Sequence, residues 1–184
     1  MHKLVGASAL MVLTVSPALA NPQTYRLDPK HSVVIFETVH QDTSTVVGWF
    51  SGVDAQLVVD RASPANSTLD AYVDLSTETT REEERDKWIE DSVLKSSSTK
   101  EAHFQSTKVV STGPTSADIF GTLTVAGVSL PDFKLSTTLV DKDDVIGISA
   151  RGTLSRKAIG SVEYPTIAAD KIDIRIEAEA TLQP

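Results

Sequence analysis

A regular alternation of apolar and polar residues near the C-terminus constrains the fold more than any other feature of the chain. From Lys171 to Leu182, every second residue is Ile, Ala or Leu, and Lys, Asp, Arg, Glu or Thr stands between them. Successive side chains of a β-strand point to opposite faces, so this segment predicts a strand with one buried and one solvated face. Residues 67–75 alternate in the same way, and residues 133–139 do so more weakly.

Other segments rich in β-branched and aromatic residues predict further strands. These segments are 33–40, 45–50, 55–60, 104–110, 119–125 and 145–154. Short polar links, such as 62–66, 112–116 and 141–144, separate them and suit antiparallel neighbours. About eight to ten strands in one domain predict an all-β fold, either a barrel or a sandwich.

Residues 78–102 interrupt this strand pattern. The sequence Thr80-Arg81-Glu82-Glu83 fits a capping box, and the acidic residues at 82–84 favour a helix N-terminus. We therefore predict a helix over residues 81–91 and a loose or briefly helical connection over 92–100. Because its only large apolar residues are Trp88 and Ile89, the helix is predicted to lie on the surface with a narrow contact stripe.

The N-terminus has the order of a secretory signal peptide. Lys3 precedes an apolar run over residues 4–15, and Ala18-Leu19-Ala20 provides a small-residue cleavage site. We predict cleavage after Ala20, so that residues 1–20 are a signal peptide and residues 21–184 form a single domain. The apolar run is shorter than the roughly 20 residues of a membrane-spanning helix, so we do not expect an integral membrane protein.

Composition excludes several kinds of site. The chain has no cysteine, so disulfides and thiolate metal sites are excluded, and its formal net charge of −8 argues against a nucleic-acid partner. It carries no Gly-x-Ser-x-Gly, no phosphate-binding glycine loop and no His-Glu-x-x-His, so no enzyme and no cofactor are predicted. His31 and His40 lie roughly 30 Å apart along one predicted strand, and we predict no metal site.

Periodicity leaves the orientation of His40 open. His40 shares a strand face with Val34 and Phe36, which places an imidazole among apolar side chains. Val33 and Ile35 form the opposite face, so alternation alone does not say which face is interior.

Arg85, in the predicted helix, also has two interpretations. Its guanidinium group suits charge-assisted hydrogen bonds to an anionic group at the mouth of a barrel. A surface ion pair with Glu82 or Glu84 is the alternative.

A series of short motifs runs along residues 25–182. They are Tyr25-Arg26-Leu27-Asp28-Pro29-Lys30-His31-Ser32 with Phe36 and His40; Gly48, Phe50 and Gly52; Leu57-Val58-Val59-Asp60; Ser76, Thr79, Arg85 and Asp86; His103-Phe104-Gln105-Ser106; Gly121-Thr122-Leu123-Thr124-Val125-Ala126-Gly127-Val128; and Leu154-Ser155-Arg156-Lys157-Ala158-Ile159-Gly160. In this order they resemble the YceI-like family of bacterial periplasmic polyisoprenoid-binding proteins. Three positions depart from the family pattern: Ala126 replaces the usual histidine, Ala102 the usual proline and Leu94 a common aromatic residue.

The resemblance implies a lipocalin-like antiparallel β-barrel of about eight strands, with a short helical insertion near residues 80–100 and an elongated apolar cavity. The implied function is periplasmic binding, transport or sequestration of a long-chain isoprenoid lipid, of quinone or polyprenyl type. The expected partner is thus an isoprenoid quinone or another long apolar lipid, and a homodimer stays open.

On this hypothesis, inward-facing apolar residues line the cavity, and His40 and Arg85 contact the lipid head group. The predicted lining residues are Phe36, Phe50, Leu57, Leu69, Val73, Phe104, Leu123, Leu135, Ile148, Ile172, Ile174 and Ile176. One alternative is a barrel filled with its own side chains that acts as a stress or envelope interaction protein without a lipid. A third hypothesis is an enzyme acting on a lipidic substrate, with His40 and a neighbouring carboxylate as acid and base.

Overall fold

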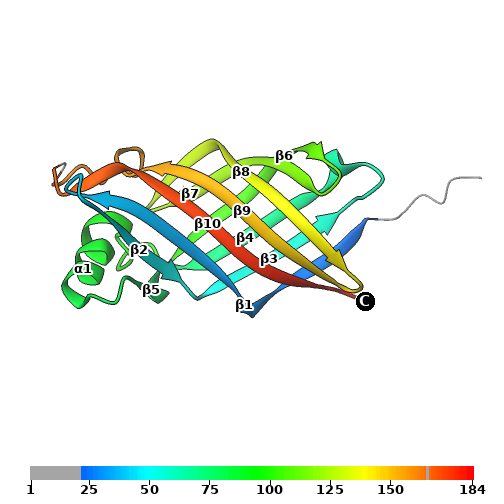
Figure 1. The fold of residues 1–184 in the computed structure, drawn as a ribbon, viewed down its shortest axis with the longest axis horizontal. Helices are drawn as coiled ribbons and strands as arrows, with labels where there is room; N and C mark the ends of the chain where they lie inside the picture. Colours follow the sequence, from blue (N-terminus) through cyan, green and yellow to red (C-terminus); the bar gives the residue numbers. More distant parts are fainter. Residues whose placement is uncertain (1–21, 165) are drawn as a thin grey trace, which may run out of the picture.

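One antiparallel sheet, closed into an elongated barrel, dominates the computed structural model, which describes residues 22–164 and 166–184 (Figure 1). The strands are β1 (Gln23–His40), β2 (Ser44–Phe50), β3 (Val53–Val59), β4 (Thr68–Asp74), β5 (Glu78–Thr79), β6 (Glu101–Gly113), β7 (Ser116–Val125), β8 (Val128–Lys142), β9 (Val145–Ser155) and β10 (Ala168–Leu182). The order β10-β9-β8-β7-β6-β4-β3-β1 closes through the β1–β10 pair into eight strands. The predicted all-β barrel of about eight strands is confirmed.

Closure depends on the length of β1, which has 18 residues and pairs with β10 from Tyr25–Leu182 to His40–Ala168. On its other edge, β1 pairs first with β3 and then with β2. Strands β2 and β3 therefore act as one strand broken at Gly52. A Cβ atom at Gly52 would lie 2.9 Å from side-chain atoms of Asp74 and Thr77, so the break requires a residue without a side chain.

The register of β1 decides which of its faces is interior. Phe36 lies opposite Ile174 of β10 and Gly48 of β2, so its side chain points into the barrel together with those of Val34 and His40. Val39, on the other face, is 40% exposed. The structure thus answers the question that alternation left open.

The helical insertion begins later and is shorter than predicted. Helix α1 (Glu83–Trp88) is capped by the Glu82 carboxylate, which accepts hydrogen bonds from the backbone N–H groups of Glu84 and Arg85. Arg81 has a left-handed φ of 64°, so the helix cannot start there. The α-helix then gives way to the π-helical turn η3 (Ile89–Leu94).

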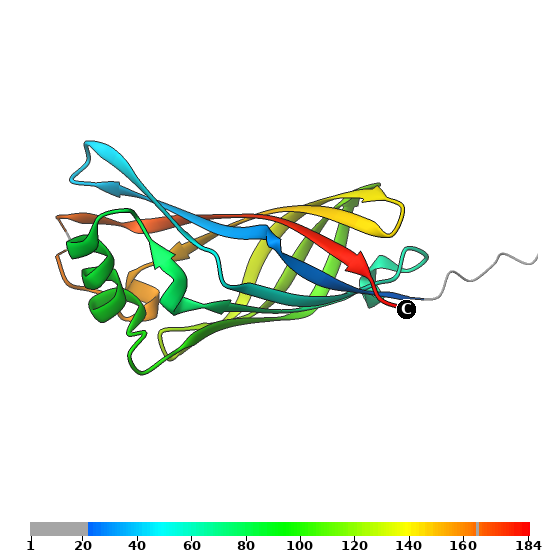
Figure 2. The same ribbon diagram turned by 90° about the horizontal axis from the view of Figure 1, so that it is seen from below.

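The predicted contacts of Trp88 and Ile89 are present, and the contact surface extends beyond the predicted helix. Ile89, Val93 and Leu94 are buried in the core, because the π-helical turn brings residues beyond the predicted helix onto the barrel. Figures 1 and 2 show α1 against one end of the barrel, called here the helix end. The C-terminus and the β8–β9 hairpin lie at the opposite end, called here the far end.

Three short 3₁₀ turns complete the described elements: η1 (Pro64–Asn66), η2 (Leu75–Thr77) and η4 (Lys157–Ile159). The predicted signal peptide, residues 1–20, lies outside the described residues. Across residues 22–164 and 166–184, no helix has the length and apolar character needed to cross a membrane.

Candidate functional site

A cavity of about 870 Å³ extends through the interior of the barrel, and its wall is mainly apolar. Its volume lies in the upper part of the range of about 300–1,000 Å³ that is usual for small-molecule sites. Ala168 and Ala178 both line it, and these residues lie roughly 33 Å apart along β10 at about 3.3 Å per residue. The cavity is therefore long, and the barrel is not filled by its own side chains.

The structure places every predicted lining residue on the cavity wall. They are Phe36, Phe50, Leu57, Leu69, Val73, Phe104, Leu123, Leu135, Ile148, Ile172, Ile174 and Ile176. Alternation brings them together because each strand presents every second side chain to the lumen. Their part in binding a ligand stays a prediction.

Small residues on the same inward faces keep the lumen open, and sequence reasoning missed them. Ala55, Ala71, Ala102, Ala150 and Ala178 all line the cavity. The interior of an eight-stranded barrel either is filled by side chains or holds one small ligand. Short inward-facing side chains leave the space that a ligand needs. The available signal was alternation itself, because Ala71 shares a face with predicted residues of its own strand.

Two glycines allow aromatic rings to lie against the wall. A Cβ atom at Gly48 would stand 2.2 Å from Cζ of Phe36, and one at Gly121 would stand 2.6 Å from Cζ of Phe104. The ring of Phe36 also lies 5.7 Å from that of Phe50, centroid to centroid. Because Gly48 and Gly121 have no side chain, the rings of Phe36 and Phe104 can lie directly against the sheet and occupy less of the cavity.

His40 and Arg85 also line the cavity, at the helix end. The guanidinium group of Arg85 donates from Nε to Thr80 Oγ1 at 2.7 Å and from Nη2 to the Thr80 carbonyl oxygen at 3.1 Å. Among the described residues, Arg85 makes these hydrogen bonds with Thr80 and forms no ion pair with Glu82 or Glu84, which was the alternative interpretation. A guanidinium group has five N–H donors, so Arg85 retains donor capacity.

Asp86 fastens α1 to the end of β5. Its carboxylate accepts hydrogen bonds from Thr79 Oγ1 at 2.8 Å, from the Thr80 backbone N–H at 2.7 Å and from Thr80 Oγ1. Burial acts to raise the pKa of Asp86, but these hydrogen bonds and Arg85 outweigh it and hold that pKa below its ordinary value. Asp86 thus stays ionised and orders the strand end that positions Arg85.

Trp88 and Tyr164 form an aromatic pair at the same end of the cavity. Their rings meet edge to face, with centroids 6.3 Å apart, and both residues line the cavity. The indole Nε1 of Trp88 is buried without a hydrogen-bond partner among the described residues. Sequence reasoning assigned Trp88 only to a surface stripe, whereas the structure adds it to the polar groups of the helix end.

The three residues that depart from the family pattern, Ala126, Ala102 and Leu94, are all apolar and buried. Ala126 is buried and adopts a left-handed φ of 53° beside Gly127 in the two-residue turn between β7 and β8. Ala102 and Leu94 line the cavity. In this part of the described chain, no cluster of three or more His, Asp or Glu side chains is placed to hold a metal ion.

Comparison with known proteins gives consistent matches. The model of the YceI-like domain family matches residues 25–180. A UPF0312 protein of Pseudomonas putida strain GB-1 is 31% identical over 191 residues, which cover 100% of this chain and 99% of that protein.

Two solved structures show the same fold. Burkholderia cenocepacia BcnA superposes with a TM-score of 0.78 at 19% identity, over 84% of this chain and 99% of that one. A polyisoprenoid binding domain from Saccharophagus degradans gives a TM-score of 0.67 at 12% identity, over 88% of this chain and 99% of that one.

Proposed function

This chain belongs to the YceI-like domain family, and we propose that it is a binding protein that encloses one long isoprenoid lipid in its barrel. The observation that carries the proposal is the apolar cavity of about 870 Å³, which follows the strands through the barrel. The Saccharophagus degradans domain with the same fold is described as polyisoprenoid binding, which supports this class of ligand.

The cavity wall suits a flexible hydrocarbon tail. Enclosing the tail removes apolar surface from water and gains roughly 0.8 kcal/mol per CH₂ group. Ten such groups gain on the order of 8 kcal/mol before the costs of association and ordering are subtracted. The tail therefore supplies affinity through shape and area, without a catalytic group.

We place the lipid head group at the helix end. Arg85, His40 and Trp88 gather there, and Arg85 and Trp88 offer N–H donors that the described protein does not use fully. A quinone carbonyl or a polyprenyl phosphate has acceptor oxygens that match such donors. The tail then extends along the lumen towards the far end.

Binding followed by transport or sequestration in the periplasm is the physiological role that we propose. The order of residues 1–20 is that of a secretory signal, which supports export. The carboxylate of Asp86 and the hydroxyl of Thr80 are engaged in holding α1 to the end of β5, which favours a structural over a catalytic role for these two groups.

The decisive experiment is native mass spectrometry of the protein isolated from its own periplasm, with solvent extraction and identification of any released lipid. We expect one isoprenoid per chain. A protein that is isolated empty and that also fails to bind added prenyl quinone and polyprenyl phosphate would contradict the proposal.

A matched pair of variants on β1 tests the site itself. Phe36→Asp places a carboxylate inside the cavity, whereas Val39→Asp places the same group on the exposed face of the same strand. We expect Phe36→Asp to lose at least about 90% of the bound lipid, because the tail would have to cover a charge. Val39→Asp should retain it. Full retention by a folded Phe36→Asp variant would show that the lipid lies elsewhere.

A further inference from the structure

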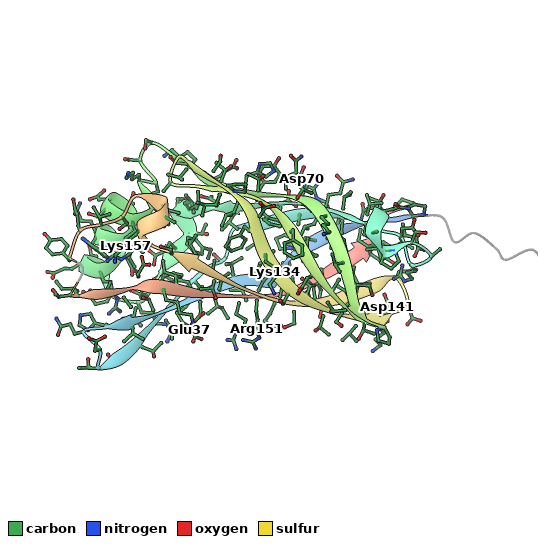
Figure 3. The ribbon with its side chains drawn as sticks, turned by 90° about the horizontal axis from the view of Figure 1, so that it is seen from above. Glu37, Asp70, Lys134, Asp141, Arg151 and Lys157 are labelled. Carbon is green, nitrogen blue, oxygen red and sulfur yellow. The ribbon has the colours of Figure 1, made fainter. Side chains whose placement is uncertain are left out.

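A charged cluster crosses the far end of the barrel. Arg61, in the loop after β3, donates to Asp141, in β8 just before the β8–β9 hairpin, from Nη2 at 2.5 Å and from Nε at 3.4 Å. The two residues are 80 positions apart in the sequence. Figure 3 shows Asp141 at the end of the barrel opposite Lys157 and the helical insertion. This pair therefore joins the connection after β3 to the end of β8, and these two strands are not neighbours in the barrel.

The arginine of this pair is held by further contacts with β1. Nη1 of Arg61 donates to Gln23 Oε1 at 2.6 Å, and Nη2 donates to the Tyr25 hydroxyl at 3.0 Å. Its guanidinium carbon lies 5.6 Å from the centre of the Tyr25 ring, and Tyr25 is only 1% exposed. Burial of the Tyr25 ring fixes one side of the cluster, so the guanidinium group has a rigid support.

Both members of the ion pair also line the cavity. Pro64, in the same connection as Arg61, and Thr115, between β6 and β7, line the cavity too. The cavity is therefore apolar along its length and reaches a fixed pair of opposite charges at this end.

Hydrogen bonding distinguishes Arg61 from Arg85, the arginine of the helix end. Four hydrogen bonds to Asp141, Gln23 and Tyr25 engage Arg61, whereas Arg85 makes two, both to Thr80. A side chain whose donors are engaged in this way is poorly suited to bind a head group, but it is well suited to close a cavity.

We propose that the Arg61–Asp141 pair is a latch that closes the far end and limits the length of the isoprenoid chain that the barrel accepts. This inference rests on the proposed function and adds the feature that selects among lipids of that class. The Arg61 and Asp141 side chains are 38% and 53% exposed, so separating them costs about 1 kcal/mol. A tail longer than the lumen would have to break this contact and would also expose its own apolar end to water. Chains that end before the latch meet no such penalty.

The first test measures chain-length preference by competition between prenyl quinones of increasing isoprene number, read by native mass spectrometry. In Arg61→Ala and in Asp141→Asn, we expect the upper length limit to move to longer chains. For the first chain beyond the wild-type limit, binding should rise about fivefold relative to shorter chains, since the exposed ion pair that excludes it is gone. Asp141→Asn removes the charge and keeps nearly the same side-chain volume, so it tests the inference even where Arg61→Ala fails to fold.

Arg26→Ala is the matched control. Arg26 forms an ion pair with Asp54 on the outside of the barrel, from the same strand that carries Gln23 and Tyr25. It should leave the length limit unchanged. A limit that stays the same in folded, lipid-binding latch variants, or that moves equally in Arg26→Ala, overturns the inference.

A second test does not depend on any lipid. Because the chain has no cysteine, Leu139→Cys introduces a single reporter thiol. Leu139 lines the cavity, and its backbone N–H donates to the carbonyl oxygen of Thr115. We expect Arg61→Ala to accelerate labelling of this thiol by a bulky maleimide about tenfold. An unchanged labelling rate means that the pair does not close the far end. Accelerated labelling in a protein that binds no isoprenoid keeps the latch but refutes the proposed function.

Discussion

Replacing Glu78 by glutamine is predicted to stabilise the protein at high pH and to leave its stability unchanged at low pH. Glu78 lies in β5 opposite Phe50 of β2, and its Oε1 atom is buried without a hydrogen-bond partner among the described residues. Burial, and then the negative charge of Asp86, raise the pKa of Glu78 from its ordinary 4.5 to about 8. Glu90 adds to this effect, and Arg85 opposes it. Glutamine keeps the shape and removes the ionisation.

The sign of the effect follows from proton linkage. Below pH 4.5 the Glu78 carboxyl is neutral in both the folded and the unfolded chain, so its ionisation does not change stability. Between pH 4.5 and about 8 the unfolded chain releases this proton and the folded chain keeps it, so the free energy of unfolding falls as the pH rises. Above about pH 8 the loss is complete.

The magnitude follows from the size of the pKa change. A rise from 4.5 to about 8 corresponds to an unscreened ceiling of roughly 5 kcal/mol, at about 1.4 kcal/mol for each pH unit. Because the Glu78 side chain is only partly buried, solvent screening reduces the expected loss to about 2 kcal/mol. The difference in unfolding free energy between Glu78→Gln and the parent should therefore grow from near zero to about 2 kcal/mol.

Urea unfolding of the lipid-free proteins, followed by the fluorescence of Trp49 and Trp88, measures this difference at several pH values and one ionic strength. Carboxylates that titrate normally cancel in the comparison. Glu101→Gln, at an exposed position of β6, is the matched control and should show no pH-dependent difference. A Glu78→Gln difference that stays constant between pH 4.5 and 9, or that falls with rising pH, would refute the reasoning.

Three further substitutions test how the helix end and the wall are built. Asp86→Ala should cost about 1–3 kcal/mol and speed hydrogen exchange across α1, since it leaves the donors of Thr80 without their acceptor; unchanged exchange would contradict its fastening role. Gly48→Ala should lower the melting temperature and cost about 1–3 kcal/mol, because its Cβ would overlap the Phe36 ring, and calorimetry measures this. Arg156→Lys should cost roughly 3 kcal/mol in urea unfolding, because the buried guanidinium group donates to four backbone carbonyl groups and an ammonium group cannot reach all of them; a loss below about 0.5 kcal/mol would argue against this role.

The sequence by itself determined the strands and their buried faces wherever alternation was unambiguous. Ile172, Ile174 and Ile176 line the lumen as predicted from their spacing, because side-chain direction in a strand is a local property with a period of two. The β-rich segments and polar links likewise predicted about eight strands and a barrel-type fold. Family motifs, rather than periodicity, narrowed this to a lipocalin-like barrel with a cavity.

Only the tertiary structure decided the features that depend on which segments meet. The interior face of β1 depends on the pairing of Phe36 with Ile174, and the start of α1 depends on Thr80 bonding to Asp86 instead of capping the helix. Whether a cavity remains inside the barrel depends on the total volume of the inward-facing side chains of all strands. The latch joins Arg61 to Asp141 across 80 residues of sequence, and no local pattern links them. Periodicity predicts the direction of each side chain along its own strand. The volume of the cavity and the contacts between distant segments are set only when the barrel closes.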